Sequence, residues 1–101
     1  MNWYIIRVVL HGANEEQYEV LHNRMAAIDC SRTIRSDGGV EYHLPPAEYF
    51  TVTTLSIENI AALARKAADG TGHANSVFVI QTTRMQWYGL QPVEQWNLQS
   101  G

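Results

Sequence analysis

Residues 30–55 read CSRTIRSDGGVEYHLPPAEYFTVTTL and contain a strand pair with the turn that joins it. Between Ser31 and Ser36, polar residues mix with apolar and β-branched ones, as in a half-buried strand. Asp37-Gly38-Gly39 is a strong turn signal, because glycine adopts positive φ without steric cost. Residues 40–44 then return as a short extended run. We therefore predict a hairpin over this part of the chain.

Two prolines follow the hairpin. Pro45 and Pro46 stop regular pairing, since neither residue can donate a backbone hydrogen bond. Residues 49–55 form another run rich in aromatic and β-branched side chains. We expect one helix and one strand on each side of the 30–55 stretch.

The first strand is predicted over residues 3–12. With a period of two, one face carries Tyr4, Ile6, Val8 and Leu10. The other face carries Trp3, Ile5, Arg7, Val9 and His11. Both faces are largely apolar, so this strand is expected in the centre of a sheet, with Arg7 and His11 on the less buried face.

The first helix begins after Asn14, a typical N-cap residue, with Gln17 at the capping-box position. The buried stripe of this helix is predicted to contain Tyr18, Leu21, Met25 and Ile28. His22 lies at the margin of that stripe, and Arg24 is expected to point away from it.

The second helix is predicted from Ser56, its N-cap, to Gly70. Residues 76–83 form the last strand, and their run at 77–80 is apolar on both faces, which predicts a buried strand. Residues 84–90 extend that strand or form an added edge strand, and Pro92 ends the pairing.

The predicted element order is β-α-β-β-α-β, in an α+β domain over residues 1–92. This is the order of the ferredoxin-like fold, with the first and third strands central and both helices on one face. The second face is left open, and an apolar open face on a small domain indicates an interface, so we expect a homodimer. Residues 93–101 form a tail without periodicity, which we expect to be partly disordered.

Composition limits the function classes. A chain of 101 residues, 46% hydrophobic and 17% charged, is typical of one globular domain. Its net charge of −3 argues against bulk attraction to nucleic acid, and no DNA partner is expected. No apolar run is long enough to span a membrane. A single cysteine, Cys30, excludes an internal disulfide and fits a cytoplasmic protein; we expect it to be a buried structural thiol.

No metal, cofactor or nucleotide motif is present, so no cofactor is expected. RNA cleavage without a metal needs only a base, an acid and cations for the phosphate. The candidate proton-transfer residues are His22 and His43, and the candidate RNA-binding residues are Arg24, Arg32 and Arg35. The alternative is that the histidines are packing or surface residues and that the arginines pair with carboxylates. Tyr42, Tyr49 and Trp87 either stack on bases or belong to the core or an interface.

From the first strand to about residue 83, the chain resembles the GhoS family. The resemblance rests on LHNRMAAIDC in the first helix, on SRTIRSDGGVEYHLPPAEYFTVTTLS, and on a second helix that begins SIENIAALAR. It implies a ferredoxin-like endoribonuclease antitoxin that cleaves a toxin transcript, with His22 and Arg24 near the RNA. The fold is similar to that of small CRISPR-associated nucleases, which carry an acidic residue at the end of the first strand. Here that strand ends Leu10-His11-Gly12, so a metal-free reaction is expected.

Two functions from different classes therefore stand side by side. The first is a GhoS-like endoribonuclease that acts on RNA. The second is a non-catalytic dimeric module that binds a protein or small ligand through the open sheet face and the tail. A different enzyme is the third alternative.

Overall fold

The computed structural model describes residues 1–93 of the chain. These residues form β1 (Asn2–Leu10), α1 (Glu15–Ala26), β2 (Thr33–Arg35), β3 (Glu41–His43), β4 (Glu48–Thr53), α2 (Ile57–Asp69) and β5 (Asn75–Thr82). Residues 94–101, which make up nearly all of the tail expected to be disordered, lie outside the described residues. In the part of the chain that is described, neither helix is long and apolar enough to cross a membrane.

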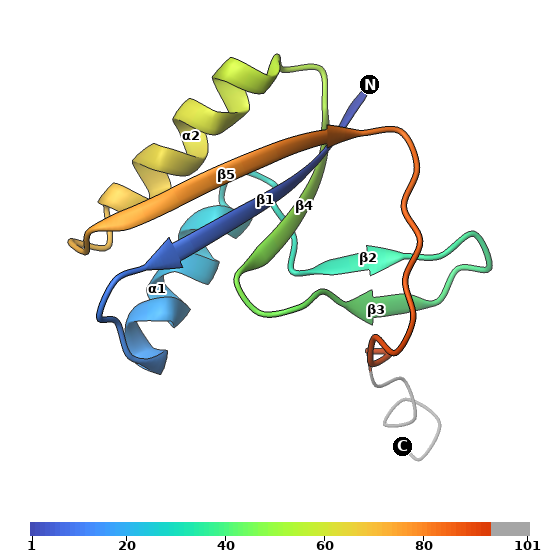
Figure 1. Ribbon diagram of the computed structural model, residues 1–101, viewed down its shortest axis with the longest axis horizontal. Helices are drawn as coiled ribbons and strands as arrows, with labels where there is room; N and C mark the ends of the chain where they lie inside the picture. Colours follow the sequence, from blue (N-terminus) through green and yellow to red (C-terminus); the bar gives the residue numbers. More distant parts are fainter. Residues whose placement is uncertain (94–101) are drawn as a thin grey trace.

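β1 is the middle strand of a three-stranded antiparallel sheet with the order β4-β1-β5. Its inner face is buried as predicted, through Tyr4, Ile6, Val8 and Leu10. Both helices lie on this side of the sheet (Figure 1), and Leu21 of α1 and Ile60 of α2 join the core there. The α+β class, the central first strand and the placement of both helices on one face are therefore confirmed.

The stretch 30–55 forms three strands instead of the predicted two. β2 and β3 pair with each other around the glycine turn, as a separate two-stranded sheet. The backbone pairing with the outer edge of β4 is a single bridge, in which Ser31 and Phe50 exchange two hydrogen bonds of 2.8 Å. The main sheet thus has three strands, without the fourth strand of the ferredoxin-like order. The reason lies in the chain after β3. Pro45 and Pro46 end the pairing of β3, and the chain forms a separate strand, β4, which pairs with β1.

β5 is an edge strand, which corrects the prediction of a strand buried on both faces. Val77 and Val79 pack against the core, whereas Phe78 is 62% exposed and Ile80 is 47% exposed. The outer face of β5 continues the open face of the sheet, on which Ile5 and Val9 of β1 also lie. Its apolar run therefore reflects an uncovered surface and not a central position.

The segment after β5 was predicted to pair up to Pro92 and stop there. Instead, residues 83–90 form no strand, and Gln91–Val93 lie alongside β3. His43 N–H donates to the carbonyl of Gln91 at 2.9 Å, and Val93 N–H donates to the carbonyl of Glu41 at 2.8 Å. Pro92 opposes Tyr42 between these two bonds, at a position where the pairing requires no N–H from it. The segment crosses over the hairpin in Figure 1.

Helix α1 begins and ends with local motifs. Its N-terminus has the predicted capping box, in which Asn14 and Gln17 bond reciprocally at 3.0 and 2.8 Å. At its C-terminus, Asp29 has φ = 61°, and the N–H of Cys30 donates to the carbonyl of Met25 at 3.0 Å. This is a Schellman motif, and its hydrophobic contact is the packing of Cys30 and Met25 in the core. Together the two motifs fix the length and rotation of the helix that carries His22.

Candidate functional site

His22 lies on α1, one residue after the buried Leu21, and is itself half-buried. Its Nδ1 lies 2.6 Å from the hydroxyl oxygen of Tyr49 on β4. The His22 ring also lies beside two tyrosine rings, with centroid distances of 5.8 Å to Tyr49 and 6.3 Å to Tyr18. The imidazole therefore has a fixed position between the helix and the sheet.

Tyr49 is fully buried, because it lies with Thr51 on the face of β4 that meets the helices. Burial raises the pKa of its phenol, so the hydroxyl keeps its proton at neutral pH. Tyr49 was predicted as a residue that stacks on a base or packs in the core. The structure selects the second role, and only the hydroxyl group reaches the site.

The pKa of His22 is lowered from its ordinary value of 6.5. Burial is the main cause, because it disfavours the charged imidazolium. The positive charge of Arg32 adds to this effect, and the carboxylate of Glu19 opposes it. His22 is therefore mostly neutral at pH 7, which is the state that accepts a proton.

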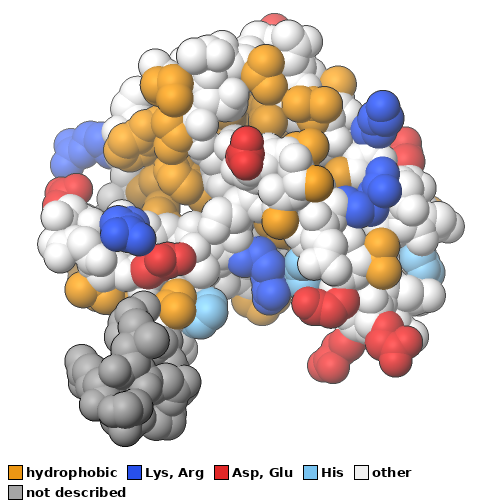
Figure 2. Space-filling model, turned by 180° about the vertical axis from the view of Figure 1, so that it is seen from behind, with side chains coloured by type: hydrophobic (Ala, Val, Ile, Leu, Met, Phe, Trp, Pro, Cys, Tyr) orange, Lys and Arg blue, Asp and Glu red, His pale blue; other side chains and the backbone are white. Residues whose placement is uncertain are grey.

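His22 opens into a depression of about 840 Å³ between the start of α1 and the turn before β4. The residues that line it are Ala13, Asn14, Glu15, Tyr18, Glu19, His22, Arg32, Pro46 and Ala47. Figure 2 shows acidic side chains gathered where α1 begins, with a basic side chain and a histidine close to them. Arg32 is thus the cation of this site, and Glu15 and Glu19 place negative charge at its rim.

Of the predicted RNA-binding residues, Arg32 is the one that lines the depression. Arg24 projects from another side of α1, where its guanidinium donates to the carbonyls of Ala67 at 2.8 Å and Lys66 at 3.4 Å. Those carbonyls belong to the last turn of α2, so Arg24 caps the neighbouring helix. It points away from the buried stripe as predicted, but it does not lie beside His22 in the site.

Arg35 and His43 lie on the hairpin. Arg35 forms an ion pair with Glu41 at 3.4 Å, which is the carboxylate pairing weighed as the alternative role. His43 is exposed and opposes Thr33 in the register of β2 and β3. Neither residue lines the His22 depression, so the two candidate histidines are not brought together.

Cys30 is a buried structural thiol. Burial raises its pKa to about 11, although the neighbouring Thr51 hydroxyl partly opposes that rise. The thiolate is therefore scarce at neutral pH, which makes Cys30 a poor nucleophile. Over residues 1–93, no group of three histidine, cysteine, aspartate or glutamate residues is placed to hold a metal ion.

Sequence reasoning missed Tyr49 as the partner of His22. Tyr18, four residues before His22, was predicted to lie in the stripe whose margin carries His22, and their rings are neighbours in the structure. Glu19, three residues before His22, also lies near it. The contact with Tyr49 joins residues 27 positions apart and depends on how α1 rests on the sheet. When the chain is compared with known proteins, no family model and no curated protein matches it.

Proposed function

We propose that this protein is an endoribonuclease that cleaves RNA without a metal, with His22 as the general base. The observation that carries the proposal is a neutral histidine, held by Tyr49 at 2.6 Å, in an open depression that also contains Arg32. General-base catalysis by a positioned side chain contributes roughly 10²- to 10⁴-fold to a rate. A cation next to the base is the second requirement, because the phosphate gains negative charge during the reaction.

In the proposed step, Nε2 of His22 takes the proton of a ribose 2′-hydroxyl. The 2′-oxygen then attacks the adjacent phosphorus, and the bond from phosphorus to the 5′-oxygen of the next nucleotide breaks. The products are a 2′,3′-cyclic phosphate and a 5′-hydroxyl, whose proton comes from water. Arg32 binds the phosphate and balances its charge.

Tyr49 acts as a positioning residue. When Nδ1–H of His22 donates to the tyrosine oxygen, the lone pair of Nε2 is free to accept a proton. The phenol stays neutral because its pKa is raised, so it adds no charge to the site. The proposed reaction requires the tautomer in which Nδ1 carries the proton, and the contact with Tyr49 holds the ring in place for it.

Glu15 and Glu19 limit the affinity for RNA. Both line the depression with Arg32, and the whole chain carries a net charge of −3. Repulsion from these carboxylates allows one phosphate to bind at Arg32 but disfavours contacts with several phosphates along the RNA backbone. The proposal therefore entails weak binding and cleavage at unpaired, flexible nucleotides. With the resemblance to the GhoS family, it extends to a ferredoxin-like antitoxin whose substrate is a toxin transcript.

The test is cleavage of an end-labelled, mixed-sequence RNA by the purified protein, in EDTA and in Mg²⁺. We expect cutting in both buffers, products that end in a cyclic phosphate, and loss of cutting in His22→Gln. His73→Gln is the matched control, because His73 does not line the depression. Arg32→Gln is expected to raise KM and lower kcat, whereas Arg84→Gln changes neither.

Tyr49→Phe separates positioning from chemistry. We expect a lower kcat with unchanged RNA binding, and a shifted acidic limb in the pH profile, because His22 loses its partner. Absence of cutting by folded wild-type protein in both buffers would overturn the proposal, and so would full activity of His22→Gln.

The open sheet face favours one second candidate, a dimeric binding module without catalysis. Trp3, Val52, Phe78 and Ile80 are all exposed large hydrophobic residues. Pairing across the sheet register places them on the same face. A surface of this kind on a small domain is typical of an interface.

A further inference from the structure

A second cavity lies on the other side of the molecule, between the open sheet face, the hairpin and the segment after β5. Its volume is about 440 Å³, within the range of small-molecule sites. Four aromatic residues line it, and each comes from a different part of the chain: Trp3 from β1, Tyr42 from β3, Phe50 from β4 and Trp87 from the C-terminal segment. The cavity therefore forms only when these four segments, which are far apart in the sequence, are packed together.

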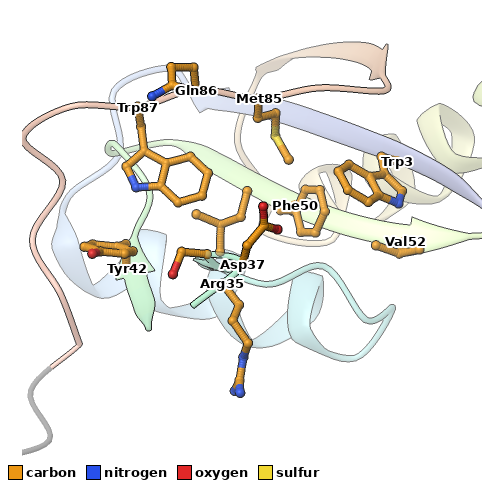
Figure 3. Close-up of a pocket in the computed structure, with 11 residues that line it drawn as sticks. Trp3, Arg35, Asp37, Tyr42, Phe50, Val52, Met85, Gln86 and Trp87 are labelled. Carbon is orange, nitrogen blue, oxygen red and sulfur yellow. The ribbon is translucent and has the colours of Figure 1, made fainter. Parts of the chain in front are cut away.

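The four rings form two angled pairs. Trp3 and Phe50 meet edge to face, with centroids 6.0 Å apart and planes at 84°. Tyr42 and Trp87 also meet edge to face, at 5.8 Å and 61°. Figure 3 shows the Trp87–Tyr42 pair on one side of the cavity and the Trp3–Phe50 pair on the other, with Met85 above them. The four rings therefore enclose the cavity from two sides, and we call this lining of Trp3, Tyr42, Phe50 and Trp87 the aromatic cage.

The charge inside this cage is negative. Asp37 lines the cavity, and its carboxylate lies between the two aromatic pairs in Figure 3. Within residues 1–93, this carboxylate has no hydrogen-bond or ion-pair partner; the described ion pairs are Arg7–Glu48, Arg35–Glu41 and Arg65–Asp69. Arg35 also borders the cavity, but its guanidinium points away from the rings in Figure 3 and pairs with Glu41.

We infer that this cavity binds a small organic cation with a methylated ammonium head group. Aromatic faces attract cations through their negative quadrupole, and methyl groups make the cation fit an apolar wall. Asp37 supplies the opposite charge, and its partial exposure to water keeps the desolvation penalty low. A neutral base would use the rings but not the carboxylate, and an anion would be repelled by it.

The experiment is titration of the full-length protein with choline, followed by calorimetry and by the NMR signals of the indole N–H groups. The matched ligand is 3,3-dimethyl-1-butanol, a neutral molecule of the same shape. We expect saturable binding of choline and about tenfold weaker binding of the neutral analogue. Shifts of the Trp3 and Trp87 indole signals locate the ligand.

Two variants test the two parts of the cage. Asp37→Asn keeps the size and turn preference of the residue and removes the charge; we expect about fivefold weaker choline binding. Trp87→Leu keeps an apolar side chain and removes the aromatic face; we expect about tenfold weaker binding. Tyr88→Leu is the control, since Tyr88 is 89% exposed and does not line the cavity.

Equal binding of choline and its neutral analogue would overturn the inference, because the cavity would then select only for shape. No saturable binding of choline to folded protein would also overturn it. A third contrary result would be that adenosine displaces choline and binds the cavity more tightly than choline does. The cage would then be assigned to a nucleobase. None of these results depends on RNA cleavage at His22.

Discussion

Ala47 occupies a backbone conformation that usually belongs to glycine. Its φ is 69°, and Glu48 N–H donates to the carbonyl of Pro45 at 3.2 Å across it. With Pro46 before Ala47, this is the pattern of a type II turn, whose third position favours glycine. The carbonyl of Ala47 also accepts from Val8 N–H at 2.9 Å, so the turn is joined to β1.

We predict that Ala47→Gly stabilises the protein by about 0.5–1 kcal/mol, because relief of the left-handed conformation exceeds the entropy cost of glycine. Urea unfolding followed by circular dichroism measures the change. Ala74→Gly is the control, because Ala74 is exposed and has no positive φ; this variant is expected to lose stability. A loss of stability in Ala47→Gly as large as in Ala74→Gly would contradict the turn argument.

His22 gives a prediction for stability against pH. Its folded pKa lies below 6.5, so the unfolded chain binds a proton more readily than the folded protein in the interval between the two values. Stability therefore falls as pH drops from 6.5 to the folded pKa, and this contribution is constant outside that interval. His22→Gln removes the contribution. We expect the difference in unfolding free energy between wild type and variant to change between pH 7.5 and pH 5, and a constant difference would contradict the lowered pKa.

At this scale, residue type led to two of the residues that line the candidate depression. His22 and Arg32 were predictable, because histidine and arginine suit proton transfer and phosphate binding. Arg24 and His43 belong to the same types but lie elsewhere in the fold, because residue type does not say which side of an element meets which neighbour. Tyr49 was missed as a partner for the same reason, since its role depends on a hydroxyl at the end of a buried ring.

At the scale of elements, Arg24 joins the two helices. Its guanidinium reaches across from α1 to the final carbonyls of α2. Gly70, the C-cap of α2, lies directly beneath it, and a Cβ at this position would overlap the guanidinium. Since the φ of Gly70 is −65°, the backbone conformation does not call for glycine, and the effect of a Cβ here is to displace the Arg24 guanidinium.

We predict that Arg24→Gln and Gly70→Ala each destabilise the protein by about 1 kcal/mol, through loss of the same charged cap. The two losses are not additive: Gly70→Ala costs little in the Arg24→Gln background, because there is no guanidinium left to displace. Chemical denaturation of the four proteins in a double-mutant cycle measures this coupling. Gly38→Ala is the control, because the nearest atom to its new Cβ is 3.8 Å away. Additive losses would show that Arg24 and Gly70 act independently.

Elements built from local signals were predicted well. The capping box of α1, the N-cap of α2 and the glycine turn of the hairpin all depend on residues within a few positions of one another. The hairpin was expected to extend the main sheet, and it does not. Whether a strand joins one sheet or another depends on which partner strand it pairs with. That partner is far away in the sequence, so no short window of sequence contains the answer.

At the scale of the whole molecule, the open sheet face gives a test of association. If two copies pair through this face, Phe78→Glu places a charge in the apolar contact and converts a dimer to a monomer with an unchanged fold. Leu63→Glu is the control, because Leu63 is exposed on α2, away from the sheet. Sedimentation equilibrium measures the mass of each protein. A monomeric wild type, or a Phe78→Glu variant that remains dimeric, would rule out this surface as the interface.

The packing of the segment after β5 was the least predictable feature. Tyr42 and Pro92 pair across fifty positions, and Trp87 reaches the cage only because that pairing brings it there. Pro92 was predicted to end the pairing because it has no N–H. In the structure its N–H would not be needed at that position, but this depends on the partner strand, which the sequence does not reveal. The aromatic cage was therefore not predictable from the sequence, although Tyr42 and Trp87 were noted there as residues that could stack on a ligand.

The central position of β1 also has a consequence during synthesis on the ribosome. β1 is made before both of its partners, and β5 is made last of the three strands. At roughly 5–20 residues per second, the nascent chain carries β1 with one edge unpaired for a few seconds after β4 is made. The run YIIRVVL is largely apolar, with Arg7 as its one charged residue, and its unpaired edge is exposed to other nascent chains in that interval. Slow codons between β4 and β5 would lengthen this exposure, so the yield of soluble protein should depend on the speed of translation there.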